Sequence, residues 1–428
     1  MMMLTPLIAL VALQGGVIDN TLLGKIVPVP TGKNGYEDYL RACDIAGHGV
    51  WSKYEEMIMY RLSKLRGNND TEDESTLLPL PPGTTLDSSD LGIRIAANDR
   101  IGGAIDIITT GNNKRVFDPR QNLSFETVFP EMAEFKMMSK VCANRAYVEF
   151  AEGKSSFAVR DLLEGLKFSR NIFDSVLISS LVSIAMQGII LAEFNRHLGQ
   201  LSLSDAQMID RACDSMIAKP YPVRDVIEHE FAMTMSSVDY VFDNPDSMLN
   251  EDQAKAIGST IKGLNSSDRA QLKGLVQQGL QQRFEVMANR LSGPESSWPV
   301  GDLTPDPMMS LEDKSISNLA LIIVYGLEGN SMQHQVTSAM AKARIQLRLL
   351  QLHAKVSEYR WQNSILPTKI EDFADAKTAR DPFTGETFHY ELKDGNYRLY
   401  STGVPGLGQI ELKYRNQLVA PGGGSDHP

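Results

Sequence analysis

Cysteine and histidine are scarce in this chain, with 3 and 7 copies among 428 residues. Cys43, Cys142 and Cys213 have no paired spacing, whereas a disulfide framework or a zinc site needs closer clustering. The shared "RACD" around Cys43 and Cys213 is interpreted as a small apolar residue on a helix in each case. We therefore expect neither a disulfide framework nor a zinc site, and cysteine usage leaves the cellular compartment open.

Positive charge is also in deficit, because 42 lysines and arginines face 53 aspartates and glutamates, for a net charge of −11. An acidic chain without a local basic run repels a phosphate backbone, so nucleic acid is excluded as an expected partner. The composition, 42% hydrophobic and 22% charged, is ordinary for globular proteins. The length is sufficient for more than one domain with its own core.

Long hydrophobic runs are missing as well. A membrane-spanning helix needs about 20 apolar residues, and no uninterrupted apolar run in this sequence is that long. The uncharged start "MMMLTPLIALVAL" has the length of a signal-peptide core. We expect residues 1–16 to be a signal peptide, with export to the periplasm or cell envelope. A buried N-terminal helix is the alternative, because no Lys or Arg precedes the run, and cleavage or retention as an anchor stays open. The stretch "VLISSLVSIAMQGIILAEF" is interrupted by serines, Gln187 and Gly188, which predicts a core helix and no transmembrane segment in the mature chain.

Loop-forming residues divide the chain. Residues 67–90 combine an acidic cluster with a Pro/Gly-rich stretch, and residues 293–308 form a second break. Between the breaks, apolar residues recur at steps of three and four, which predicts a mainly α fold. The expected divisions are an N-terminal helical region at 17–128, a helical body at 129–332, a C-terminal module at 333–418 and a disordered tail at 419–428.

The body contains a helical hairpin that resembles the tetratricopeptide type. The predicted helices run from 131 to about 151, from 156 to about 173, and from about 175 to 198. The residues at the usual tetratricopeptide offsets are Ala146, Gly153, Ala158, Leu162 and Gly165. Glu149 replaces the usual aromatic residue and no copy recurs 34 residues later, so one hairpin in a helical array is expected rather than a repeat protein.

The predicted helix from Val336 to Trp361 carries two apolar stripes on nearly opposite sides. One stripe is Val336, Met340, Ala343, Leu347, Leu350 and Ala354, and the other is Ile345, Leu349, Leu352, Val356 and Tyr359. A helix that is apolar on two sides is buried between two layers. The polar flank between the stripes, Arg344, Arg348, Gln351 and Lys355, together with Arg360, is interpreted as a solvated face, and an acidic partner is the alternative.

The C-terminal sequence predicts an antiparallel β-meander after this helix. Phe388, Tyr390 and Leu392 alternate as in a half-buried strand, and Asp394-Gly395 is typical of a hairpin turn. Tyr397, Leu399 and Ser401 alternate on the return strand, and "QIELKY" predicts a third strand.

The segment from "SEYRWQNSILPTKIEDF" to "ARDPFTGETFHYELKDGNYRLYSTG" resembles the globular part of type II secretion pseudopilins and pilins. The resemblance implies a long helix followed by a small meander. The apolar segment that precedes the helix in pilins and the acidic calcium loop are both missing, so neither filament assembly nor calcium binding is expected. The chain also resembles a group of exported bacterial helical proteins for which no activity is known. The stretches that carry this resemblance are the C-terminal segment, "NGYEDYLRACD" and "FPEMAEFKMMSKVCANRAYVEFAEGKSSFAVRDLL".

Motifs for catalysis and cofactor binding are sparse. "GKSS" at Gly153 lacks the earlier glycine of a phosphate loop and is interpreted as an interhelical turn. Glu228-His229-Glu230 offers metal ligands or an acid–base pair, but Met233 stands where a zinc protease has its second histidine. The remaining histidines show no ligand spacing; they are His48, His197, His334, His353, His389 and His427. We expect no cofactor and no metal.

Two functions remain open. The favoured one is a non-enzymatic scaffold of the cell envelope that binds proteins, in association with secretion or pilus-like machinery. The alternative is an exported hydrolase with a site around Glu228, His229 and Glu230. The environment of His229 discriminates between them, because a catalytic histidine needs a pocket with further histidines or carboxylates.

Overall fold

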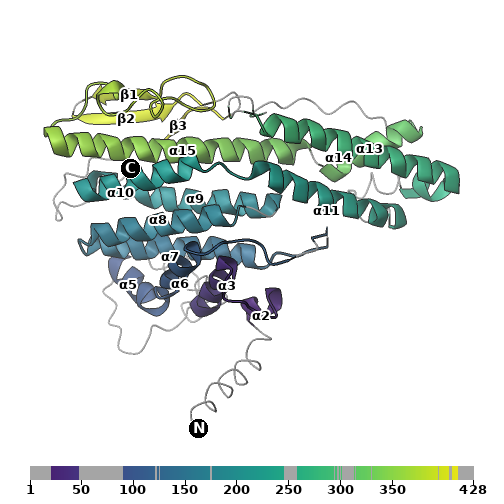
Figure 1. Ribbon diagram of the computed structural model, residues 1–428, viewed down its shortest axis with the longest axis horizontal. Coiled ribbons are helices and arrows are strands. Elements are labelled where there is room, and N and C mark those ends of the chain that lie inside the picture. The colour runs from purple at the N-terminus through teal and green to yellow at the C-terminus, as the bar shows by residue number, and fades with distance from the viewer. Residues whose placement is uncertain are drawn as a thin grey trace, which may run out of the picture.

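The computed structural model is mostly helical and ends in a small antiparallel sheet, which confirms the predicted fold class at this level (Figure 1). It describes residues 21–47, 90–120, 123–124, 126–173, 176–244, 258–293, 295, 298, 300, 313, 315–328, 330–393, 395–403 and 407–412. The expected signal peptide, residues 67–89 of the acidic loop and the expected tail lie outside the described residues.

The helices are stacked in layers beneath the sheet (Figure 1). Helix α15 lies under the sheet, α9 and α10 pack against α15, and α8 and α7 follow. The shorter helices α2, α3, α5 and α6 lie at the far side. The bounds are α2 Leu22–Ile26, α3 Gly35–Ala46, α5 Asp90–Ile101, α6 Ala104–Asn112, α7 Glu131–Ala151, α8 Ser155–Asn171, α9 Leu177–His197, α10 Leu203–Ala218 and α15 Asn330–Asn363.

The α7–α8 hairpin follows the sequence closely. Its turn contains Gly153, whose φ of 76° is accessible to glycine at little cost. Ala146 and Ala158 are fully buried. A Cβ added at Gly165 would lie 2.9 Å from the Cδ1 of Ile190, so the small residue permits α8 to approach α9 closely.

Aromatic rings join the N-terminal helices to the body. Tyr39 of α3 contacts Phe168 of α8 with ring centroids 4.5 Å apart, and Phe135 of α7 lies 5.5 Å from Phe168. Tyr36 packs edge-on against Phe135 at 5.3 Å. These edge-to-face contacts add to the gain from burying large apolar surface, so region 21–47 is part of the main core.

Helix α9 is the one helix among the described residues that is long and apolar enough to cross a membrane, by length and composition. In this fold it packs against α7, α8 and α15. Its serines and Gln187, which interrupt the apolar sequence, are largely buried, and several are hydrogen-bonded within the protein. Ser179 donates to the carbonyl of Val176, and Gln187 accepts a hydrogen bond of 2.7 Å from Tyr221.

Three further helices extend to one side as an arm (Figure 1). They are α11 Val223–Asp243, α13 Ser266–Leu291 and α14 Ile316–Glu328. The arm has a small core of its own that includes Val241, Leu272, Val276 and Ile323. A separate cluster that includes Phe173, Val226 and Leu291 joins it to the body.

Both predicted stripes of α15 are buried from Val336 to Val356, and Tyr359 is half-buried. The helix packs against α9 and α10 on one side and against β2 and β3 on the other. It therefore lies between two layers, as the two stripes predict.

The interpretation of the polar flank of α15 as a solvated face, and the alternative of an acidic partner, are wrong for its first residues. Arg344 is 8% exposed, and its Nε donates to Glu295 at 2.7 Å while its Nη1 donates to the carbonyl of Ile217 at 3.1 Å. This arginine therefore binds groups of the protein itself.

The rest of the flank is directed toward α10. Gln351 donates to Asp210 at 2.9 Å, and Lys355 pairs with the other oxygen of Asp210 at 2.9 Å. Arg348 donates to the side-chain oxygen of Gln351 at 2.6 Å. Burial and the neighbouring charge of Arg344 lower the pKa of Arg348. The flank is polar because it forms a hydrogen-bonded seam between α15 and α10.

The sheet has the order β1-β2-β3, with all strands antiparallel. The strands are β1 His389–Lys393, β2 Asn396–Ser401 and β3 Ile410–Glu411. Tyr390 pairs with Leu399 across the hairpin, and Gly395 in the turn has a φ of 73°. The predicted alternation holds for the buried Phe388 and the half-buried Tyr390, whereas Leu392 is 44% exposed at the hairpin end.

Candidate functional site

The predicted triplet on α11 does not form a common site. Glu228 and His229 are exposed, and Glu228 pairs with Arg224 one turn earlier at 2.8 Å. Glu230 instead accepts the backbone N–H of Leu177, at 3.2 Å, at the start of α9. Burial raises the pKa of Glu230, and this hydrogen bond opposes the shift. Among the described residues no group of three or more His, Cys, Asp or Glu side chains has metal-site geometry.

The "GKSS" segment is an interhelical turn, as interpreted from the sequence. The hydroxyls of Ser155 and Ser156 donate to the two oxygens of Asp205, at 2.8 and 2.7 Å. Asp205 also accepts the backbone N–H of Ser202. Burial would raise the pKa of Asp205, but the hydroxyl and backbone hydrogen bonds lower it. One buried carboxylate thus joins the first turns of α8 and α10.

The histidines with described side chains lie in separate elements. His197 stacks on Phe150 with centroids 4.0 Å apart, and His389 stacks on Tyr400 at 4.9 Å. His353 is buried between α15 and the sheet. The side chains of His48, His334 and His427 lie outside the described residues.

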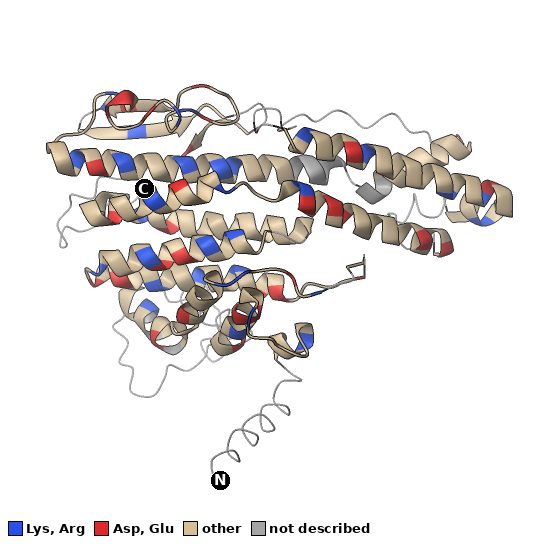
Figure 2. Ribbon diagram, in the orientation of Figure 1, with Lys and Arg blue, Asp and Glu red and all other residues tan. Residues whose placement is uncertain are grey.

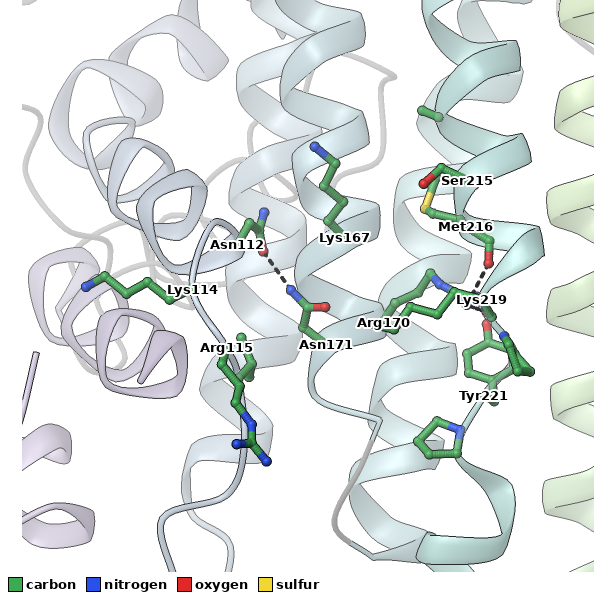
Figure 3. A pocket seen from close by; sticks show the side chains of 14 residues that line it. Asn112, Lys114, Arg115, Lys167, Arg170, Asn171, Ser215, Met216, Lys219 and Tyr221 are labelled. Atoms are coloured by element: carbon green, nitrogen blue, oxygen red, sulfur yellow. Dashed lines mark hydrogen bonds between the residues drawn. The ribbon is translucent and has the colours of Figure 1, made fainter. Parts of the chain in front are cut away.

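A cavity of about 510 Å³ opens where the end of α6, the end of α8 and the α10–α11 connection meet (Figure 3). It is lined by Asn112, Lys114, Arg115, Val116, Lys167, Arg170, Asn171, Ala212, Ser215, Met216, Lys219, Pro220, Tyr221 and Pro222. This volume falls within the range of pockets that hold small organic ligands, about 300–1,000 Å³.

The charged side chains that line the cavity in the described part of the chain are all cations. They come from three separate segments and are Lys114, Arg115, Lys167, Arg170 and Lys219. Among the described residues that line it there is no carboxylate, histidine or cysteine. Elsewhere, basic and acidic residues are interspersed along the helices (Figure 2). The cavity is therefore a local positive site on an acidic protein.

Two of these cations form ion pairs with carboxylates that do not line the cavity. Lys114 pairs with Asp38 at 2.6 Å, and Lys167 pairs with Glu164 at 2.6 Å. Within the described part of the chain, Arg115 and Lys219 form no ion pair with a carboxylate, and both are exposed. Their charges are available to a ligand.

Arg170 is the most enclosed cation of the site. Its Nη2 donates to the carbonyls of Met216 and Lys219, at 2.9 and 2.7 Å, and its guanidinium lies 4.3 Å from the ring centre of Tyr221. Its Nη1 is buried and has no hydrogen-bond partner among the described residues. Burial lowers the pKa of Arg170, which Tyr221 opposes and the charge of Arg344 reinforces. An uncompensated, desolvated cation favours the approach of an anion.

Amides form the polar wall of the cavity. Asn112 donates to the side chain of Glu164 at 2.8 Å and accepts from the hydroxyl of Tyr39 at 2.7 Å. Asn171 donates to the Tyr39 oxygen at 2.9 Å and more weakly to Asn112 (Figure 3). These contacts fix α3, α6 and α8 relative to one another, so this wall is preorganised.

The sequence carries only faint signs of this site. Lys114 and Arg115 are adjacent, and Lys167 and Arg170 are one turn apart, but neither pair is a basic run. Lys219 lies about fifty residues further on, and only the packing of α8 against α10 brings it near. Comparison with family models, curated proteins and solved structures gave no match for this chain.

Proposed function

We propose that this protein is a non-enzymatic binding protein whose cavity holds a small, negatively charged ligand. The observation that carries the proposal is a cavity whose described lining has five cations and no carboxylate, in a chain of net charge −11. The described lining also lacks the histidine, cysteine and carboxylate groups that would activate a nucleophile, and its lysines are ion-paired or exposed rather than desolvated. The side chains present support binding rather than bond cleavage.

The energetics favour an anion with more than one charge-assisted contact. Each hydrogen bond to a charged group contributes about 1.5–3 kcal/mol net. Arg170 is held in place by two backbone carbonyls, so it loses little freedom on binding. Arg115 and Lys219 are exposed and adjust to the ligand, because their long side chains are free to change rotamer.

Thermal unfolding with different anions tests the proposal. A ligand that binds only the folded state raises the melting temperature. At constant ionic strength, citrate or pyrophosphate should raise the melting temperature of the wild type more than chloride does. The Arg115→Glu/Lys219→Glu variant should not show this additional rise. Lys342→Glu, an exposed cation of α15 outside the cavity, is the control and should respond as the wild type does. An equal response of the wild type and the double variant to every anion would refute the proposal.

A second role as a protein-binding scaffold is favoured by the arm. A groove of about 420 Å³ lies between α13 and α14, with Gly279 and Val324 in its wall and the 46%-exposed Leu321 at its edge. A photo-crosslinking residue at Leu321 should capture a protein in intact cells. The same residue at exposed Phe157 of α8 is the control, and equal capture at both positions would speak against a specific partner.

We also propose the location and finer fold on sequence grounds. The short apolar start and the pseudopilin resemblance of 333–418 support a place in the periplasm or cell envelope, near secretion or pilus-like machinery. The close approach of α8 to α9 at Gly165 supports a tetratricopeptide-like hairpin within the body. Glu228, His229 and Glu230 have no role in this proposal.

A further inference from the structure

We infer that the ligand of the cationic cavity is a phosphate monoester with an organic part, taken up as a free small molecule. The inference rests on the proposed function, because it specifies the chemical class of the anion. It follows from four features of the lining: the number of uncompensated cations, the apolar wall, the polar groups and the cavity volume.

The charge of the site favours a dianion. Arg115, Arg170 and Lys219 have no carboxylate partner among the described residues. A monocarboxylate would leave most of this charge uncompensated, whereas a phosphate monoester carries about −1.5 to −2 at pH 7 and presents three acceptor oxygens. Arg170 donates to the carbonyl of Lys219, so these two residues are adjacent and their cationic groups can bind different oxygens of one phosphate. The side chain of Arg115 points away from Arg170 in Figure 3 and reaches the same phosphate by a change of rotamer.

The apolar wall favours an organic group attached to that phosphate. Val116, Ala212, Met216, Pro220 and Pro222 line the cavity together with the cations. Inorganic phosphate would contact the cations and leave this wall in water. Burial of apolar surface contributes roughly 25 cal/mol per Å², so an ester whose organic part covers the wall binds more tightly than phosphate alone.

Further polar groups of the lining suit a hydroxylated or heterocyclic moiety. Asn171 and Ser215 line the cavity, and the amide of Asn171 is already oriented by Tyr39. The amide of Asn112, by contrast, is fully engaged by Glu164, Tyr39 and Asn171. A nucleoside or a sugar offers donors and acceptors to such groups. A cavity of about 510 Å³ is large enough for either, while a polymeric nucleic acid would be repelled by the overall charge.

Isothermal titration calorimetry on the full chain at constant salt tests the inference. The probes are adenosine 5′-monophosphate and glucose 6-phosphate, their neutral counterparts adenosine and glucose, inorganic phosphate, and citrate. At least one ester should bind about tenfold or more tightly than inorganic phosphate and citrate, and its neutral counterpart should not bind detectably. Arg115→Glu/Lys219→Glu should weaken that ester by about tenfold or more, and Lys342→Glu should leave it unchanged.

The failures of the two proposals are distinguishable. If citrate or inorganic phosphate binds at the cavity as tightly as both esters, the inference of a phosphate monoester is wrong, whereas the proposed anion-binding function is still supported. No binding of any anionic probe would overturn both. Binding only to phosphatidic acid vesicles, and to neither ester nor phosphatidylcholine vesicles, would place the phosphate in a lipid headgroup and overturn the free small molecule.

Arg115 and Lys219 are chosen because both are exposed, whereas Arg170 also holds two backbone carbonyls and its loss would disturb the fold.

Discussion

His353 of α15 lies between Tyr397 of β2 and the carbonyl of Leu412. Its Nδ1 is 2.8 Å from the Tyr397 hydroxyl oxygen, and its Nε2 is 2.9 Å from the Leu412 carbonyl oxygen. A carbonyl only accepts, so Nε2 donates to Leu412. Burial disfavours the charged ring, so at neutral pH the ring is neutral and Nδ1 accepts from the Tyr397 hydroxyl. Its burial lowers its pKa to about 4, which the hydrogen bond to Leu412 only partly opposes.

This geometry predicts a loss of stability in mild acid. The pKa of His353 is about 4 in the folded state, whereas that of an unperturbed histidine is 6.5, so the unfolded chain binds the extra proton between these values. The free energy of unfolding should fall as the pH drops from about 6.5 to 4, by up to about 3 kcal/mol for this residue. Urea unfolding of the wild type and His353→Gln at pH 7 and 4.5 measures the effect. The stability difference between them should shrink at the lower pH, and a constant difference would contradict the prediction.

Glu149 should show the opposite pH dependence. Burial, followed by the charge of Asp161, raises its pKa from 4.5 to about 7, against the attraction of Arg145. The folded state therefore holds the proton more tightly, and the associated stability is lost as the pH rises through 7. Glu149→Gln should be more stable than the wild type at pH 8, by about 1–3 kcal/mol, with a smaller gain at pH 5. Urea unfolding at the two pH values measures it, and an equal gain at both would argue against a raised pKa.

Both stripes of α15 should be required for stability. Leu349 lies one turn before His353 and so faces the sheet, whereas Leu347 faces the helical body; both are at most 1% exposed. Leu347→Ala and Leu349→Ala should each cost about 2–5 kcal/mol, because each leaves a cavity in a packed core. Leu392→Ala, at a 44%-exposed position, serves as the control in chemical denaturation. A neutral Leu347→Ala or Leu349→Ala would mean that its stripe is not packed in solution.

The C-terminal module should not require calcium. Asp381 is the most buried carboxylate among the described residues of this module, and it already accepts the backbone N–H of Phe383 at 2.8 Å and the hydroxyl of Ser401. Calcium needs six to eight oxygen ligands, and the bonded oxygens of Asp381 are not free to supply them. The melting temperature should be the same in calcium and in a chelator. A clear rise with calcium would reveal oxygen ligands outside those described.

The N-terminal segment should be absent from the mature protein. Residues 1–16 have the apolar core of a signal peptide, and cleavage follows such a core closely. N-terminal sequencing of protein from the native cell should show a start between about residues 13 and 20, the usual position after an apolar core of this size. An intact Met1 in a cytoplasmic fraction would overturn the proposed export.

The sequence by itself determined the elements and their buried faces. The predicted helix at 131–151 matches α7, the two stripes of α15 are buried, and the turn at Gly395 joins two antiparallel strands. These features follow from local periodicity and backbone preference, which a short window of residues carries in full.

Only the tertiary structure decided where the polar side chains point. The flank with Gln351 and Lys355 looks solvated in sequence, and it is internal because Asp210, some 140 residues earlier, lies opposite it. Lys219 likewise joins Arg115 in one cavity through packing alone. A local pattern records which face is apolar, but whether a charge meets water, a counter-charge or a cavity depends on residues that are distant in the chain and adjacent only after folding.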